Sequence, residues 1–301
     1  VQIAARALRQ FNREIQRELG VGNVLTMAEE ATIKNVEEMF QHPKVALICA
    51  TGGPAVVNAA MKSGKRVIAA GPGNPPVVVD ETADLDRAAE SIIAGASFDN
   101  NLLCIAEKEV FVVASVADGF LAAMRRAGAV QLDAPAIDRL TSAAFRFENG
   151  QAHVKREYIG KDVAFLAQAA GAGAPPGTDL LFGETREDHP FVQEEQMMPF
   201  LPVVRVANVD AAIAAAVKAE HGCRHTAVIH SRNIENATRM ARAMNCTLFV
   251  QNAPCFASLG VGGPSYLSHS IATPTGEGVT TPMTFTRQRR IVIGGGALRI
   301  V

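Results

Sequence analysis

The chain of 301 residues is 48% hydrophobic and carries a formal net charge of -1 at pH 7. Its length and composition suffice for two compact domains with well-covered cores. Because Lys and Arg are spread evenly and form no basic stripe, nucleic acid and acidic membrane surfaces are excluded as partners, and small molecules are expected instead. No apolar run reaches the ~18 residues of a membrane span and the start does not resemble a signal peptide, so we expect a soluble, cytoplasmic protein.

The first part of the chain alternates between predicted helices and strands. Apolar residues fall at helical spacing before residue 20, at Leu8, Phe11, Ile15 and Leu19. The elements expected next are a strand at 23–27, a helix at 31–43, a strand at 44–50, a helix at 53–64 and a strand at 65–71. Helices between continuous apolar strands favour a parallel sheet covered on both faces, so this region predicts part of a doubly wound nucleotide-binding domain. Because the first residue already lies in a predicted helix, we expect the chain to begin partway through a domain.

A second α/β region follows. Its predicted helices are 84–96 and 211–220, and its predicted strands are 108–113, 201–206, 226–231 and 247–252. The Gly/Ala/Pro stretch at 170–179 predicts a surface loop. The tail, "TFTRQRRIVIGGGALRIV", predicts a strand or hairpin with a Gly-rich bend, and such an arm is typical of pairing with another subunit.

One cysteine occupies a setting that suits a nucleophile. Cys104 follows the polar, turn-forming residues Asp99, Asn100 and Asn101 and precedes an apolar strand, so its thiol should be reachable and fixed by a rigid element. A thiol is the best neutral-pH nucleophile among side chains. A buried, inert cysteine is the competing interpretation, and we prefer it for Cys49, Cys223, Cys246 and Cys255. No CxxC pair occurs, so we expect no metal, no disulfide framework and a reducing compartment.

Other candidates are weaker on their own. Thr51, Gly52 and Gly53 connect a predicted strand to a helix, where free N–H groups suit a pyrophosphate, but a bare Gly-Gly between strand and helix is more often a tight turn. Glu195 precedes a strand and is either functional or a solvated carboxylate. His225 and His230 flank the strand "TAVI" and are either bases or structural.

Four long motifs follow one another along the chain: "AAGPGNPPVVVDETADLDRAAESIIAGASFDNNLLCIAEKEV", "EEQMMPFLPVVRV", "HTAVIHSRN" and "ATPTGEGVTTPMTFTRQRR". Together they resemble the CoA-acylating aldehyde dehydrogenases, in particular the propionaldehyde and acetaldehyde dehydrogenases of bacterial microcompartments. The resemblance implies an aldehyde dehydrogenase-like α/β fold with a partial Rossmann-type cofactor domain at 1–72, a catalytic thiol domain at 73–275, and a return segment with a C-terminal β arm at 276–301.

The resemblance also implies roles for the candidates. Cys104 is expected to attack an aldehyde, to pass hydride to NAD and to hold the acyl group as a thioester until coenzyme A takes it, and its backbone N–H should stabilise the oxyanion. Glu195 matches the position that binds the nicotinamide ribose. Thr51, Gly52 and Gly53 match the loop near the cofactor phosphates, and His225 matches a histidine that we associate with the CoA thiol.

One difference from the family pattern distinguishes hydrolysis of the thioester from acyl transfer to CoA. Hydrolytic relatives carry a water-activating glutamate where this chain has Ala70, next to Gly71, and both positions are expected to border the cofactor site. With no base there, the thioester should wait for a thiol, which favours acyl transfer to CoA.

Further expectations follow from the family. Two alternatives to an acylating enzyme remain: a hydrolytic aldehyde dehydrogenase, against which Ala70 argues, and a non-catalytic assembly module. The second is kept because well over a hundred residues of the family pattern precede the point where this chain begins. The partners expected are a small aldehyde, a homodimer or homotetramer and, by family analogy, a microcompartment shell.

Overall fold

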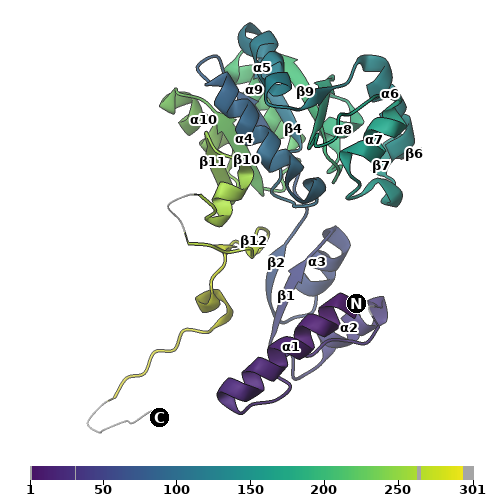
Figure 1. Ribbon diagram of the computed structural model, residues 1–301. Coiled ribbons are helices and arrows are strands. Elements are labelled where there is room, and N and C mark those ends of the chain that lie inside the picture. The colour runs from purple at the N-terminus through teal and green to yellow at the C-terminus, as the bar shows by residue number, and fades with distance from the viewer. Residues whose placement is uncertain (1, 31, 263–265, 294–301) are drawn as a thin grey trace. The chain divides into compact units, whose positions relative to one another are not determined.

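The computed structural model describes residues 2–30, 32–262 and 266–293 (Figure 1). The chain divides into two compact units, Val1–Ala69 and Ala70–Val301, each of which is described by itself. Within the described ranges, every helix is too short or too polar to cross a membrane.

The first unit is small and mostly helical. Its elements are α1 (Gln2–Leu19), α2 (Ile33–Gln41), β1 (Leu47–Thr51), α3 (Pro54–Met61) and β2 (Arg66–Ala70). The two strands pair with each other, and Ile48, Ala50 and Ala60 form a core between this sheet and α3. All five elements were expected from the sequence within a few residues.

The strand predicted at 23–27 was wrong. This segment carries no strand, although Val24 and Leu25 have the apolar character of one. The reason is a side chain on α1: the Asn12 amide donates to the Leu25 carbonyl at 2.7 Å, and its oxygen accepts from the Leu25 N–H at 2.9 Å. Backbone groups satisfied by a side chain need no partner strand.

The second unit is built on one parallel sheet, as predicted. Its strand order is β11-β10-β3-β4-β9-β8-β5, and every neighbouring pair runs parallel. The strands are β3 (Pro76–Val79), β4 (Glu109–Val113), β5 (Val130–Gln131), β8 (Leu181–Glu184), β9 (Phe200–Val206), β10 (Thr226–His230) and β11 (Leu248–Gln251).

Helices cover both faces of this sheet, as the ribbon shows (Figure 1). α4 (Leu85–Ser97) and α5 (Ala114–Arg126) pack on the side chains of Val77 and Val110. α9 (Val209–Ala219) and α10 (Ile234–Met244) pack on Val78 and Phe111. Successive strand residues point to opposite faces, so strands with continuous apolar sequence serve both cores.

The rest of the second unit lies beyond the β8 and β5 edge and in the return segment. A third core joins α6 (Ala134–Ala144), α7 (Val163–Ala170) and α8 (Pro190–Gln193). The antiparallel hairpin β6 (Phe145–Glu148) and β7 (Gln151–Val154) was not anticipated, and β12 (Ile271–Ala272) pairs antiparallel with β13 (Gly278–Val279). Short 3₁₀ turns are η1 (Phe98–Asn101), η2 (Arg156–Tyr158), η3 (Cys255–Leu259) and η4 (Pro282–Phe285).

Two predicted connections have different outcomes. The Gly/Ala/Pro stretch at 170–179 is a loop, as expected, and Gly171 closes α7 with φ 64°. In the tail, residues 286–293 carry no strand, and residues 294–301 lie outside the described residues. The β arm therefore stays a prediction.

Candidate active site

Four segments meet at one edge of the sheet in the second unit. Gly73, Cys104, Glu195 and His225 each precede the start of a strand, respectively β3, β4, β9 and β10. These strands are neighbours in the order β10-β3-β4-β9 and run parallel, so the residues before them lie at the same amino edge. The topology thus brings together three predicted site residues and adds Gly73, which was not predicted.

Gly73 touches the other three residues. A Cβ added to it would lie 2.5 Å from the Cys104 carbonyl oxygen and 2.9 Å from Cγ of His225. Its N–H donates a hydrogen bond to the Glu195 carboxylate. Only glycine fits this close approach, so Gly73 sets the spacing between the thiol segment and the histidine.

The segment before Cys104 has an unusual backbone. Asp99, Asn100 and Asn101 lie consecutively in the left-handed region, with φ 49°, 52° and 62°. Asn and Asp tolerate this region better than other non-glycine residues. Asn100 donates to the Gly160 carbonyl at 3.0 Å, which anchors the turn. The turn character predicted for this run is confirmed, and Cys104 is half-buried.

The environment disfavours a free thiolate at Cys104. Burial raises the pKa of the Cys104 thiol, the Glu195 carboxylate raises it further, and Lys108 and the Cys104 N–H oppose them. Burial also raises the pKa of Glu195, against Lys108 and the Gly73 N–H. Cys104 therefore rests as a thiol, and its activation requires positive charge or proton removal.

His225 is a neutral imidazole in this site. It is fully buried, its backbone N–H donates to the Glu220 carboxylate at 2.7 Å, and its ring Nδ1 lies 2.7 Å from the Thr226 hydroxyl. Burial, aided by Lys108, lowers the His225 pKa to about 4. Its Nε2 has no hydrogen-bond partner within the described part of the chain, so this nitrogen remains available to a bound group.

Three consecutive charged residues behind Cys104 are fully buried, and they were not predicted. They are Glu107, Lys108 and Glu109. Burial lowers the pKa of Lys108 to about 8 and raises that of Glu107 to about 7. The sequence did hold a signal, because a Glu-Lys-Glu run directly before a continuous apolar strand places charge where the core is expected.

Ala70 ends β2 and is buried in the core of the second unit. Its methyl group cannot act as a base. The neighbouring Gly71 N–H donates to the Thr273 hydroxyl at 3.2 Å, which ties this segment to the residue that follows β12. Thus the position that the resemblance assigns to a water-activating glutamate holds no titratable group.

Thr51, Gly52 and Gly53 lie in the first unit, between β1 and α3. Gly53 is the N-cap of α3 and Pro54 follows at its first turn. A Cβ added to Gly53 would meet nothing within 4 Å, and one on Gly52 would make only ordinary contact with Val56. Internal packing does not require these glycines, and the helix N-terminus offers free N–H groups. Their role at cofactor phosphates stays a prediction.

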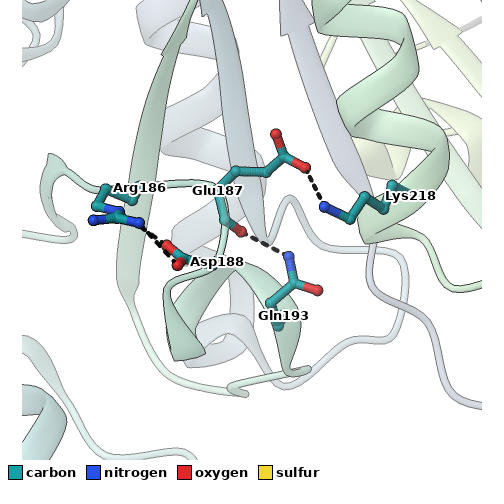
Figure 2. A network of polar contacts seen from close by, with 5 residues as sticks. All are labelled: Arg186, Glu187, Asp188, Gln193 and Lys218. Carbon is teal, nitrogen blue, oxygen red and sulfur yellow. Dashed lines mark hydrogen bonds and ion pairs between the residues drawn. The ribbon is translucent and has the colours of Figure 1, made fainter.

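A polar network holds the segment that leads to Glu195 (Figure 2). The Lys218 ammonium of α9 contacts the Glu187 carboxylate at 2.7 Å, and Gln193 donates to the Glu187 carbonyl at 2.7 Å. Arg186 pairs with Asp188 at 3.1 Å. The side chains of Glu187 and Gln193 thereby fix the chain between β8 and α8.

Two further observations concern His230 and possible metal ligands. His230 is buried within β10, and burial lowers its pKa to about 4, which favours its structural interpretation. Across the described ranges, no group of three or more His, Cys, Asp or Glu could hold a metal ion.

Comparison with known proteins places the chain in a family. The sequence profile of the aldehyde dehydrogenase family matches residues 2–263. The acetaldehyde dehydrogenase (acetylating) EutE of Salmonella typhimurium is 48% identical over 303 residues, covering 100% of this chain and 65% of its own length. The chain thus spans less than two thirds of that relative.

Solved structures agree. Propionaldehyde dehydrogenase from Rhodopseudomonas palustris, with bound CoA and an acylated cysteine, superposes with a TM-score of 0.90 at 42% identity, covering 95% of this chain and 64% of that one. A propionaldehyde dehydrogenase from the fucose utilisation microcompartment of Clostridium phytofermentans superposes with a TM-score of 0.92 at 39% identity, covering 97% and 66%. On the family match, the parallel α/β sheet and the cysteine at its amino edge, the chain belongs to the aldehyde dehydrogenase family.

Proposed function

We propose that the protein carrying this chain oxidises a short-chain aldehyde, propionaldehyde or acetaldehyde, to its acyl-CoA with reduction of NAD+. The observation that carries the proposal is the pairing of a reachable thiol at Cys104 with a buried alanine at Ala70, where a hydrolytic enzyme needs a base. The acylated cysteine and bound CoA of the R. palustris relative support the same chemistry.

In the proposed reaction, Cys104 loses its proton as Sγ forms a bond to the aldehyde carbon, giving a thiohemiacetal. When bound at this site, NAD would supply the hydride acceptor, and loss of hydride from that carbon would leave a thioester on Cys104. The Cys104 N–H faces the developing oxyanion. CoA thiol then displaces Sγ, Cys104 recovers a proton, and the net products are acyl-CoA, NADH and a proton.

Two site residues have supporting roles in this proposal. Glu195 accepts hydrogen bonds from the nicotinamide ribose, as the family pattern implies. His225 handles the CoA thiol through Nε2, the atom left without a partner in the described structure. Because its pKa is near 4, His225 acts as a neutral hydrogen-bonding group rather than as a standing strong base.

The test is NADH absorbance from the purified protein with propionaldehyde and NAD+, with CoA added partway. A small burst that becomes steady turnover only with CoA is expected. Cys104→Ala should abolish the burst, whereas the half-buried Cys246→Ala should keep it. Steady turnover without CoA would refute the acylating assignment and indicate a hydrolytic enzyme.

The role of His225 is tested in the same assay. His225→Ala should keep the burst and slow the CoA-dependent phase, because only the second step uses the imidazole. The exposed His269→Ala is the matched control. A His225→Ala protein with normal CoA saturation and rate would remove this residue from the mechanism.

We also propose a homo-oligomeric state, a dimer or tetramer, and residence in the cytoplasm or in a bacterial microcompartment. The C. phytofermentans relative comes from such a compartment and supports the second setting. Light scattering of the purified protein and copurification with shell proteins are the two measurements. A monomer that never copurifies with shell would contradict both.

A further inference from the structure

Lys108 connects three segments of the active site through four hydrogen bonds. Its Nζ donates to the carbonyl and to the side-chain oxygen of Asn101 at 2.7 and 2.5 Å. Its N–H donates to the Pro75 carbonyl at 3.0 Å, and its carbonyl accepts from the Gln196 amide at 2.9 Å. These partners lie a few residues from Cys104, Gly73 and Glu195. The main chain of Lys108 makes the bonds to Pro75 and Gln196, and its side chain makes the two bonds to Asn101, so the lysine itself acts on the segment that leads to the thiol.

The Asn101 contact stabilises a backbone that would otherwise relax. Asn101 is the last of three consecutive left-handed residues, and such a run persists only where its surroundings hold it. The Asn101 amide also donates to the carbonyls of Ala96 and Glu107. Because Lys108 donates to the side-chain oxygen and the carbonyl of Asn101, both the nitrogen and the oxygen of this buried amide have partners. Asn101 lies three residues before Cys104.

Lys108 also carries charge into the site. Its side chain is fully buried, and its ammonium donates to two oxygens of the neutral Asn101. Among the described residues, Lys108 forms no ion pair within 4.0 Å, so no close carboxylate neutralises its charge. The titratable groups that face it are Cys104, Glu107, Glu109, Glu195, His225 and Cys255.

We propose that Lys108 is a positioning residue for the Cys104 nucleophile: it holds the left-handed turn that presents the thiol and supplies the buried positive charge that faces the thiolate and the Glu195 carboxylate. The inference rests on the proposed function only in taking Cys104 as the nucleophile. Protonated Lys108 favours the thiolate, and the pKa of Lys108 near 8 keeps that charge present at neutral pH.

The test measures thiol reactivity and needs no turnover. Iodoacetamide modification of Cys104 is followed by peptide mass spectrometry across roughly pH 6 to 9, the range in which protein thiols ionise. The variants are Lys108→Met, which removes charge and donors, Lys108→Gln, which keeps N–H donors without charge, and Lys108→Arg, which keeps charge. Lys155→Met is the matched control, because Lys155 also bonds backbone carbonyls, those of Ser142 and Ala143.

Both neutral variants should modify Cys104 about tenfold more slowly at neutral pH, which corresponds to a shift of about one unit in the thiol pKa. Lys108→Arg should recover part of the rate, and Lys155→Met should match the parent chain. A folded Lys108→Gln protein with the parent pH profile would overturn the proposal and leave Lys108 a purely structural group. If Lys108→Met does not fold by circular dichroism, Lys108→Gln alone decides. A parent protein that lacks CoA-dependent turnover, while the Lys108 variants still slow modification of Cys104, would refute the proposed function and leave this inference standing.

Discussion

Gly73→Ala adds one methyl group at the amino edge of the sheet, and it should damage the active site more than a methyl group added at any other position there. The new Cβ would lie 2.5 Å from the Cys104 carbonyl oxygen, which is about 0.9 Å short of an ordinary contact near 3.4 Å, and 2.9 Å from the His225 ring. Neither neighbour can move freely, since one is backbone and the other is a buried ring. Overpacking of this kind costs about 1–3 kcal/mol of stability.

The expected effect on activity is larger than the effect on stability. If Cys104 relaxes by most of that overlap, a displacement near 1 Å can cost about 10²-fold in rate. The unfolding temperature should fall by about 2–12 °C, since each kcal/mol shifts a domain of this size by about 2–4 °C. The assays are CoA-dependent NADH formation, iodoacetamide modification of Cys104 and differential scanning calorimetry.

Gly173→Ala is the matched control, because a Cβ there meets nothing within 4 Å. It should leave both rate and unfolding temperature unchanged. A Gly73→Ala protein with parental turnover and parental Cys104 reactivity would refute the argument that this glycine sets the position of the thiol.

Two further predictions concern stability. Burial raises the pKa of Glu107 from 4.5 to about 7, so the folded state binds an extra proton, and this group alone should lower the free energy of unfolding by about 3 kcal/mol as pH rises from 4.5 to 7. Because burial raises the pKa of Glu109 as well, urea unfolding across that range should show a shallower slope in Glu107→Gln than in the parent, and equal slopes would contradict the prediction. Asp80→Ala should lower the free energy of unfolding by about 3 kcal/mol, because the buried carboxylate accepts from Thr82 N–H, Thr82 hydroxyl, Ser231 and Asn236. Asp210→Ala breaks one exposed ion pair with Arg239 and should change that free energy by less than ~0.5 kcal/mol. Similar losses in urea unfolding of both variants would refute this ranking.

The fold was largely visible in the sequence because its signals are local. Continuous apolar strands such as β4 and helices with Asp or Asn caps, such as α4 and α9, carry their own signatures. The error at 23–27 and the missed hairpin β6–β7 arise where the local sequence does not determine the secondary structure. In the first, the Asn12 side chain replaced a partner strand.

The site was only partly visible, for a related reason. Cys104 was predicted from its immediate neighbours, whereas the importance of Gly73 depends on a contact with His225, far away in sequence. The role of Lys108 likewise shows only in the bonds that its buried ammonium makes to Asn101. Sequence spacing cannot reveal such contacts until the strand order is known.

The amino-edge location has a consequence for folding. The site exists only when β10 pairs with β3, a contact between Val228 and Val77 that closes a loop of about 150 residues. Pairings of such long sequence separation form late and slowly. The buried environment of Cys104 should therefore be among the last features to form during refolding. In partly folded chains, the Cys104 thiol should react like that of an exposed cysteine. Time-resolved labelling of Cys104 would thus report completion of the central sheet rather than formation of the helices around it.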